Sequence, residues 1–402
     1  MVRAGPALAP REFAEVRRRM ALDGCKWDPQ VGDVRVIAPF PLLLGRGEWE
    51  RLARTAEALY AETERVEAAV MARPDLQKRI GVPRALRRVL ARVGDGAEVT
   101  PTAARVMRFD FHPTADGWRV SEVNADVPGG YAEAWELARL VAGANPGYGP
   151  AGDPAGALVE AIARRAGDGA IVALLWAPGY MEDLQVVSYL ARRLEERGMR
   201  AVRVAPGQLH WSADGRAVVR GVEQAAVVRF FQAEWLPGVR GHNWARLLVG
   251  GRTPVTNPAG AIIGESKRLP LVWDDLPFEV PVWRAALPET RELRDAPWRA
   301  DDGWVIKAAY GNTGDAVAGR AITPPVAWRR AARAARLRPG RWVAQRRFET
   351  AAVESPAGPV FPCLGVYVID GKAAGAYGRV TAKATIDFEA RDVAVLVEEV
   401  AG

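Results

Sequence analysis

The sequence predicts an α/β protein with more than one domain. Three observations support this prediction: a helical region near the start, short β-prone segments around residue 110, and an alternation of helix and strand between residues 155 and 231. The chain has 402 residues, of which 49% are hydrophobic, so it is long enough to bury a large core and to divide into domains.

Residues 11–100 are expected to be mostly helical. Over residues 48–73 the apolar side chains recur close to every 3.6 positions among charged ones, which is the pattern of a helix with one buried face. The period then changes to that of strands at residues 105–111 and 118–123. An Asp-Gly pair between these segments is a turn signal, so the two strands are predicted to form a hairpin.

The middle of the chain is predicted to form a βαβ unit. A stretch rich in glycine and proline, residues 128–154, is expected to be a loop. The elements predicted after it are helices at 155–165 and 181–197 and strands at 170–176, 201–204 and 225–231. This alternation favours a small parallel sheet covered by helices.

The last third combines strands with one helix. The predicted strands cover residues 304–308, 341–345, 364–369 and 373–377, and the predicted helix covers 326–337. Asp370-Gly371 joins the last two strands and indicates a second tight hairpin.

The composition excludes several classes of protein. Two cysteines cannot build a disulfide scaffold, and three histidines without an HExxH pair argue against a zinc hydrolase. No apolar run approaches the roughly 18 residues of a membrane helix, and residues 1–20 lack the apolar core of a signal peptide. We therefore expect a cytoplasmic protein with no membrane partner. The net charge of +7 is too small by itself to indicate a nucleic-acid partner.

Four polar side chains on the first predicted hairpin form a pattern that suits a metal ion. Arg108 and Asp110 lie two apart on one strand, and Glu122 and Asn124 lie two apart on the next, so each pair shares a face. Pairing of the strands would gather the oxygens of Asp110, Glu122 and Asn124, which suit Mg²⁺. Arg108 beside them would hold a phosphate. A solvated hairpin with an ordinary ion pair is the alternative.

Lysine is rare in this chain, with six lysines among 55 basic residues. Lys307 ends a predicted buried strand and precedes a turn bracketed by glycines, an arrangement that offers an ammonium and backbone N–H groups to phosphates. The residues of this turn are Gly311, Asn312, Thr313 and Gly314. Lys267 opens a stretch rich in Leu, Pro and Trp, and Arg379 ends the C-terminal hairpin. The alternative is a plain turn for residues 311–314, a surface lysine for Lys267 and a surface arginine for Arg379.

Two further features are open to two interpretations each. The helix predicted at 326–337 carries Arg329, Arg330, Arg333 and Arg336 on one side, which suits either a polyanion such as RNA or a solvated face in an arginine-rich protein. Acids near tryptophans would suit a cationic amine or lie in surface loops. These residues are Glu234, Trp235, Trp273, Asp274, Asp275 and Trp283.

The motifs follow one another in an order that resembles glutathionylspermidine synthase and its relatives, over roughly residues 20–400. The order is RxD at 108–110, ExNAD at 122–126, FFQAEWL at 230–236, ESK at 265–267, VIK at 305–307 with GNTG, WVAQ at 342–345 and GVYVIDGKAAGAYGR at 365–379. The spacing of RxD and ExNAD, with eleven residues between them, is the most specific part.

The resemblance implies an α/β ATP-grasp fold in which the order of the motifs is circularly permuted. It covers the synthetase domain alone. This fold would include an N-terminal helical region and an inserted Rossmann-like domain, which is the pre-ATP-grasp domain. Residues 1–149 would hold the helical region and the metal-binding hairpin of the core. Residues 150–262 would form the Rossmann-like substrate domain, and residues 263–402 the ATP-grasp lid and the C-terminal core.

The resemblance also implies ATP and Mg²⁺ as cofactors and assigns residues to them. Asp110, Glu122 and Asn124 would hold the Mg²⁺ ions that bridge the ATP phosphates. Arg108 would contact the γ-phosphate and the acyl phosphate formed from it.

For the nucleotide, the resemblance implies that Lys267 and Lys307 bind the phosphates under the flexible loop Gly311–Gly314. Gln345 would sit at the adenine hinge, and Arg379 would stabilise the phosphoryl group during transfer. One departure from the family pattern is the Val127–Gly130 stretch, which replaces the usual Thr-rich continuation and leaves glutathione in doubt as the acid.

The implied activity is that of an ATP-dependent carboxylate–amine ligase. ATP would phosphorylate a small-molecule or peptide carboxylic acid, and an amine would then attack the acyl phosphate, giving an amide, ADP and phosphate. A lid between about 268 and 345 would exclude water. The alternatives are an ATP-grasp phosphotransferase and an arginine-rich nucleic-acid-binding protein with a vestigial ATP site. The acid, the amine and the oligomeric state do not follow from the sequence.

Overall fold

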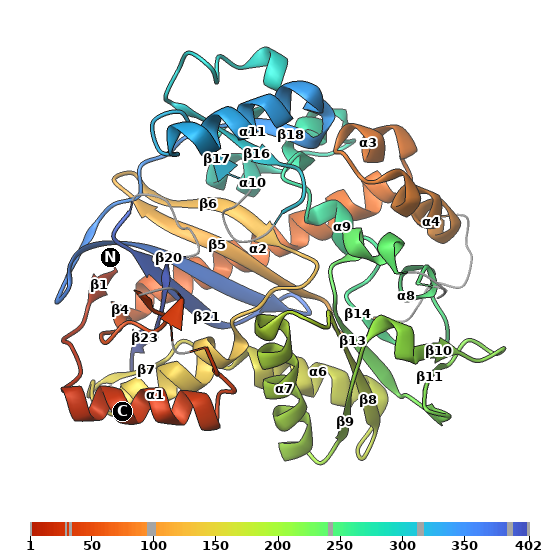
Figure 1. The fold of residues 1–402 in the computed structure, drawn as a ribbon, viewed down its shortest axis with the longest axis horizontal. Helices are drawn as coiled ribbons and strands as arrows, with labels where there is room; N and C mark the ends of the chain where they lie inside the picture. Colours follow the sequence, from red (N-terminus) through yellow and green to blue (C-terminus); the bar gives the residue numbers. More distant parts are fainter. Residues whose placement is uncertain are drawn as a thin grey trace.

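The computed structural model describes residues 2–28, 30–31, 34–94, 102–239, 244–311, 317–383 and 389–399. The predicted α/β class is confirmed, because antiparallel and parallel sheets are combined with helices that cover them (Figure 1). Within these ranges no helix is long and apolar enough to span a membrane.

A six-stranded antiparallel sheet, the central sheet, lies in the middle of the molecule (Figure 1). Its order is β22 (Arg391–Val393), β21 (Lys372–Thr381), β20 (Gly358–Ile369), β5 (Val106–Thr114) and β6 (Gly117–Asn124), with β19 (Val353–Ser355) paired to β20. Both predicted hairpins, β5–β6 and β20–β21, are confirmed. Asp370 and Gly371, in the turn between β20 and β21, have φ of 47° and 82°, as a tight turn of this kind requires.

Helix α2 (Arg46–Met71) covers one face of the central sheet. Its buried residues recur at helical spacing, as predicted, and join Phe109 and Val366 of the sheet in the main core cluster. Successive side chains of a strand point to opposite faces. The neighbours of Phe109, Arg108 and Asp110, are therefore turned to the face away from α2.

The predicted βαβ region forms a four-stranded parallel sheet. Its order is β14 (Val255–Thr256), β13 (Ala226–Phe230), β8 (Ile171–Trp176) and β9 (Arg200–Val204). Helices α6 (Pro154–Ala166) and α7 (Met181–Glu196) connect and cover it. Strands β8 and β13 are mostly apolar and buried, as expected for a parallel sheet covered by helices, and the one charged residue in them, Arg229, is paired with Asp126.

A third sheet, called the lid sheet here, lies at the top of Figure 1. Its order is β15 (Thr290–Arg291), β18 (Trp342–Arg346), β16 (Trp304–Ala308) and β17 (Val317–Ala318). Helix α11 (Pro325–Leu337) packs on it, and the two share a small core of their own that includes Trp304 and Ala335. The strands and the helix predicted here agree with the structure to within one residue.

The N-terminal region and the segment 128–154 differ in part from the prediction. A fourth sheet combines β1 (Arg3–Ala4), β4 (Leu42–Leu44), β23 (Val395–Glu398) and β7 (Tyr148–Pro150), so the helical region also contributes strands. The prediction of a loop over 128–154 is wrong in part, because a π-helical turn η1 (Glu133–Leu137) continues into α5 (Ala138–Ala142). Apolar residues at helical spacing lie there, between the glycines and prolines on which the loop prediction rested.

Short elements complete the described fold. The helices are α1 (Pro10–Leu22), α3 (Pro74–Arg79), α4 (Arg84–Gly94), α8 (Arg246–Val249), α9 (Ala261–Gly264) and α10 (Pro281–Ala286), with 3₁₀ turns η2 (Pro206–Gln208), η3 (Ala233–Gly238), η4 (Leu269–Asp275), η5 (Leu293–Asp295) and η6 (Pro339–Arg341). The strands are β2 (Gln30–Val31), β3 (Val34–Arg35), β10 (Leu209–Trp211), β11 (Ala217–Val219) and β12 (Val222–Glu223).

Candidate functional site

A cavity of about 420 Å³ is lined by the central sheet, the lid sheet and the start of α7. Every predicted site residue that the structure describes lines it: Arg108, Asp110, Glu122, Asn124, Lys267, Lys307, Gly311, Gln345 and Arg379. Asn312, Thr313 and Gly314 lie outside the described residues. Side chains from distant parts of the chain therefore meet in one place, as binding sites between sheets commonly require.

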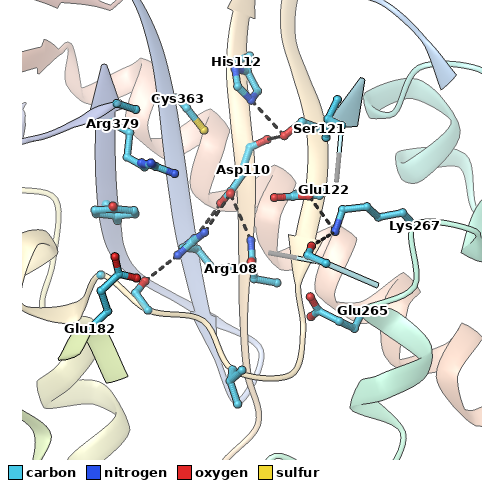
Figure 2. Close-up of a pocket in the computed structure, with 18 of the residues that line it drawn as sticks. Arg108, Asp110, His112, Ser121, Glu122, Glu182, Glu265, Lys267, Cys363 and Arg379 are labelled. Atoms are coloured by element: carbon cyan, nitrogen blue, oxygen red, sulfur yellow. Dashed lines mark hydrogen bonds and ion pairs between the residues drawn. The ribbon is translucent and has the colours of Figure 1, made fainter. Parts of the chain in front are cut away.

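Arg108 and Asp110 form a bidentate ion pair on the cavity face of β5 (Figure 2). Nε of Arg108 lies 2.8 Å from Oδ1 of Asp110, and Nη2 lies 3.0 Å from Oδ2. Nη1 also donates to the backbone oxygen of Gly129 at 2.7 Å. Gly365 pairs with Asp110 on the neighbouring strand, and a Cβ there would lie 2.6 Å from Cδ of Arg108. The glycine therefore leaves the space that the arginine fills.

Glu122 and Asn124 complete the predicted oxygen set. Asp110 pairs with Glu122 across β5 and β6, and Nδ2 of Asn124 donates to Oδ2 of Asp110 at 3.2 Å. Oε2 of Glu122 lies 3.2 Å from Nζ of Lys267. Each of the two carboxylates is thus paired with a basic side chain that also lines the cavity.

This donor set fits a hard divalent cation, because carboxylate and amide oxygens are the ligands that Mg²⁺ prefers. In the described part of the chain no three His, Cys, Asp or Glu side chains are grouped to hold a metal ion. A cation bound here would therefore need the amide of Asn124 beside Asp110 and Glu122. It would also compete with Arg108 and Lys267 for the carboxylates.

A β-bulge at Ser121 was not predicted and shapes the site. The pairing of β5 and β6 shifts register at this point, which leaves Ser121 as an extra residue. Its backbone oxygen accepts a hydrogen bond from Nζ of Lys307 at 3.0 Å. Its hydroxyl lies 3.1 Å from Nε2 of the buried His112. Ser121 at the bulge therefore contacts both the lysine of the lid sheet and the buried histidine of β5.

The charges in the cavity shift one another's pKa values. Burial alone would raise the pKa of Glu122, but the neighbouring Lys267 and Lys307 outweigh burial and lower it to about 2. Burial lowers the pKa of Lys307 to about 8, against the attraction of Glu122. Burial lowers the pKa of His112 to about 4, so its imidazole is neutral at neutral pH. The lysines next to Glu122 make this side of the cavity suitable for an anion.

The part of the cavity under the lid sheet is partly apolar. Val305 of β16, Val317 of β17 and Ile322 line it. Gln345 is buried near the end of β18, and its Nε2 donates to Oγ1 of Thr290 at 3.0 Å. Arg346–Phe348 follow Gln345 and line the same space. An apolar slot beside a strand end is suited to a flat aromatic ring.

Arg379 lies near the end of β21, opposite Cys363 of β20. Figure 2 shows its guanidinium on the same side of the central sheet as Arg108 and Asp110. Two arginines thus lie along one wall of the cavity, where they would attract the negative oxygens of a phosphoryl group.

The sequence analysis missed a group of acidic side chains on the side of the cavity away from Lys267. Nζ of Lys26 lies 2.7 Å from Oε1 of Glu133 and 2.8 Å from Oδ2 of Asp392. Glu182 and Asp183, at the start of α7, line the same side, and Figure 2 shows Glu182 there. The rarity of lysine was a usable signal for Lys26. The acids carry no such signal, because they come from separate elements.

The residues of the tryptophan-rich strip do not form one site. Trp273 and Trp283 are buried in the main core cluster. Asp274 and Asp275 form surface ion pairs with arginines. Within this set only Glu234 lines the cavity. These acids and tryptophans therefore form no common amine site, and the alternative interpretation of surface loops holds for Asp274 and Asp275.

Comparison with known proteins identifies one family and a related fold. The family described as glutathionylspermidine synthase preATP-grasp matches residues 41–398. The structure of a glutathione synthetase-like effector (GSS30) from Globodera pallida covers 96% of each chain, with a TM-score of 0.65 and 12% identity. At this identity the likeness concerns the fold alone, and it supports the α/β ATP-grasp fold.

A second solved structure, assigned provisionally as a gamma-glutamylcysteine synthetase of Methylobacillus flagellatus, is more distant. It has a TM-score of 0.42 and 11% identity, and it covers 80% of this chain and 84% of its own. No curated protein matches the sequence.

Proposed function

We propose that this chain, which belongs to the glutathionylspermidine synthase preATP-grasp family, is an ATP-dependent ligase that joins a carboxylic acid to an amine. The observation that carries the proposal is the convergence of nine sequence-predicted residues on one cavity. The cavity combines two carboxylates and an amide with lysines and arginines. These are the groups that phosphoryl transfer needs, since that reaction depends on positioning and charge neutralisation.

We place the adenine ring of ATP in the apolar slot beside Val305 and Val317, next to the chain that follows Gln345. The phosphates would extend toward Lys267, Lys307 and the loop that begins at Gly311. Nζ of Lys267 donates to the backbone oxygen of Gly311 at 2.9 Å, so this lysine also holds the start of the loop. Both lysines are buried, which strengthens their attraction for phosphate oxygens.

Asp110, Glu122 and Asn124 would hold Mg²⁺, which would supply charge neutralisation for the phosphates when bound. A carboxylate that turns to the cation releases its present partner. Arg108 would then be free for the oxygens of the transferred phosphoryl group, and Lys267 for the nucleotide.

The reaction itself needs no nucleophile from the protein. An oxygen of the substrate carboxylate attacks the γ-phosphorus, ADP leaves, and an acyl phosphate forms. The amine nitrogen then attacks the acyl carbon, phosphate leaves, and the nitrogen loses a proton to give the amide. Arg108 and Arg379 would stabilise the negative charge on the phosphoryl oxygens in both steps.

Water has to be excluded, because the acyl phosphate would otherwise hydrolyse. We propose the lid sheet and its surroundings, between about 268 and 345, as the part that closes over the cavity. We also propose that the chain divides into the three predicted regions, residues 1–149, 150–262 and 263–402.

The amine would lie on the acidic side of the cavity. Glu182, Asp183 and Asp392 line that side and would attract a cationic amine. Lys26 offsets part of this charge, because it lies between Glu133 and Asp392. The acid would then lie between this side and the phosphates, within reach of Arg108.

The test is a screen of ATP consumption with pairs of acids and amines, including amino acids, small peptides and polyamines, followed by product mass. A ligase releases ADP only when both substrates are present, and its product has the mass of acid plus amine minus water. A phosphorylated acceptor without an amide would instead indicate a phosphotransferase. No ATP turnover with any pair, although the protein is folded and binds ATP, would contradict the proposal.

A further inference from the structure

The segment 317–347 carries a large local excess of positive charge. Residues 317–347 contain nine arginines and no acidic residue. The rest of the chain contains 46 basic and 48 acidic residues, so without this segment it would be slightly acidic. The segment, which contains α11, therefore carries a formal charge of +9, and a second basic stretch, residues 78–92, contains six basic residues and no acidic one.

The arginines of α11 are exposed and have no acidic partner among the described residues. Arg329, Arg330, Arg333 and Arg336 are all exposed. In the described ranges none of the four has an acidic group within ion-pair distance. In contrast, Arg320 and Arg346 of the same segment pair with Asp302 and Asp301.

Exposed arginines elsewhere on the surface are commonly paired. Arg18, Arg197 and Arg216 each lie within 3.0 Å of a carboxylate oxygen. Helix α4 is comparable to α11, because its exposed Arg84, Arg88 and Arg92 also have no acidic partner among the described residues. What distinguishes α11 is the hollowed surface on which its arginines lie.

The surface around these arginines is hollowed. Two depressions of about 470 and 600 Å³ lie between α11 and residues 293–300, and Arg299 and Arg336 line both. Arg294 lines the first, and Arg329 and Arg333 line the second. Ala332, Ala335 and Trp328 are among the residues that line them. The two depressions thus adjoin at Arg299 and Arg336 and are together bordered by five arginines, and we call the pair the α11 groove.

The α11 groove is separate from the cavity described above. Of the residues that the structure describes, none lines both. In Figure 1, α11 lies on the outer side of the lid sheet, at the edge of the molecule. A ligand in this groove would therefore leave the proposed active site open.

We propose that the α11 groove binds the phosphate backbone of a nucleic acid. The charge of the groove is complementary to a dense polyanion, and each arginine that neutralises a phosphate releases condensed counterions. The guanidinium fork also matches phosphate oxygens in a bidentate geometry. Arg329, Arg333 and Arg336 are spaced by four and three residues along the helix, so they form a continuous row on one face.

The test is fluorescence anisotropy with three labelled probes: an RNA duplex and a DNA duplex of about 20 base pairs and a single strand of similar length, starting at about 50 mM salt. The main variant replaces Arg329, Arg333 and Arg336 with glutamine. The control variant replaces Arg164, Arg197 and Arg216 with glutamine, which removes the same charge from other parts of the surface.

The expected result is binding by the wild type that weakens steeply with salt. The α11 variant should bind at least about 10-fold more weakly, and its salt slope should fall by about 2 to 3, as expected for three lost phosphate contacts. The control variant should stay within about 2-fold of the wild type. The probe that binds most tightly identifies the form of the nucleic acid.

Three results would overturn the proposal. The first is no binding of any probe at low salt by the folded wild type. The second is an equal loss in the control variant, which would indicate a general charge effect. The third is equally tight binding of polyglutamate with the same loss in the α11 variant, which would indicate an acidic protein partner instead. Because ATP turnover is measured separately, the ligase proposal stands or falls independently of these results.

Discussion

Nζ of Lys307 in β16 donates a hydrogen bond to the backbone oxygen of Ser121 in β6, 3.0 Å away. The two residues belong to different sheets, so this bond joins the lid sheet to the central sheet across the cavity. Ser121 lies at the bulge of β6, the edge strand of the central sheet. Lys307 is therefore placed both to bind a phosphate and to link the two walls of the site.

Replacement of Lys307 with methionine should lower ATP turnover by about 100- to 1000-fold, as expected when one charge-stabilising group is lost. Methionine keeps the length of the buried side chain but loses the hydrogen bond to Ser121, so stability should fall by about 1–3 kcal/mol while the protein stays folded. Steady-state ADP release and the melting temperature measure the two effects. The matched control is Lys78→Met, since Lys78 is exposed on α3. Turnover near the wild-type value in Lys307→Met would exclude the proposed role.

Replacement of Gly365 with alanine should displace Arg108. The new Cβ would lie 2.6 Å from Cδ and 2.7 Å from Nε of Arg108, whose guanidinium is held by Asp110. We expect a loss of stability of about 1–3 kcal/mol from overpacking and a clear loss of ATP turnover. Gly47→Ala is the control, because a Cβ at Gly47 has no neighbour within 4 Å. If both variants behave like the wild type, the space beside Arg108 is not restricted.

Removal of the Asp110 carboxylate should destabilise the protein as well as inactivate it. Asp110→Ala would leave the buried Arg108 without its counter-charge, which is expected to cost about 3–5 kcal/mol. Denaturant unfolding measures this loss. The matched control is Asp274→Ala, which breaks an exposed ion pair with Arg284 and should cost at most about 1 kcal/mol. Equal losses would show that the Arg108–Asp110 pair behaves like a surface pair.

Glu234 should make the protein less stable as the pH rises toward 7. Burial, helped by the negative charge of Asp126, raises the pKa of Glu234 from 4.5 to about 7, and its Oε2 is buried without a hydrogen-bond partner among the described residues. The folded state thus binds the proton more tightly than the unfolded state. Unfolding then releases a proton between pH 4.5 and about 7, so stability falls across this range and is flat above it.

The measurement is the free energy of unfolding of Glu234→Gln and the wild type from pH 5 to pH 8. Glutamine does not ionise, so the free energy of unfolding of the variant should increase relative to that of the wild type as the pH rises. The relative increase should be on the order of 2–3 kcal/mol at pH 8. Glu223→Gln, on an exposed strand, is the control and should show no such trend. A constant difference between Glu234→Gln and the wild type across the range would contradict the raised pKa.

Much of the fold could be predicted because its signals are local. The β5–β6 and β20–β21 hairpins each contain an Asp-Gly turn, and the strands of the parallel sheet are apolar runs between amphipathic helices. The helix over 133–142 was not predicted, because its helical pattern is short and the glycines and prolines on both sides of it indicated a loop. Local patterns of this kind act over a few residues and are visible without knowledge of the fold.

The sequence alone determined the residue types of the site and the face that each occupies on its strand, because side chains alternate along a strand with a period of two. It did not determine which of these side chains meet. Three contacts depend on how separate parts of the fold pack together: Lys267 with Glu122, Lys307 with the backbone oxygen of Ser121, and Lys26 with Glu133 and Asp392. Such contacts join residues far apart in the chain, and only the tertiary structure decides them, since register and packing act over the whole fold.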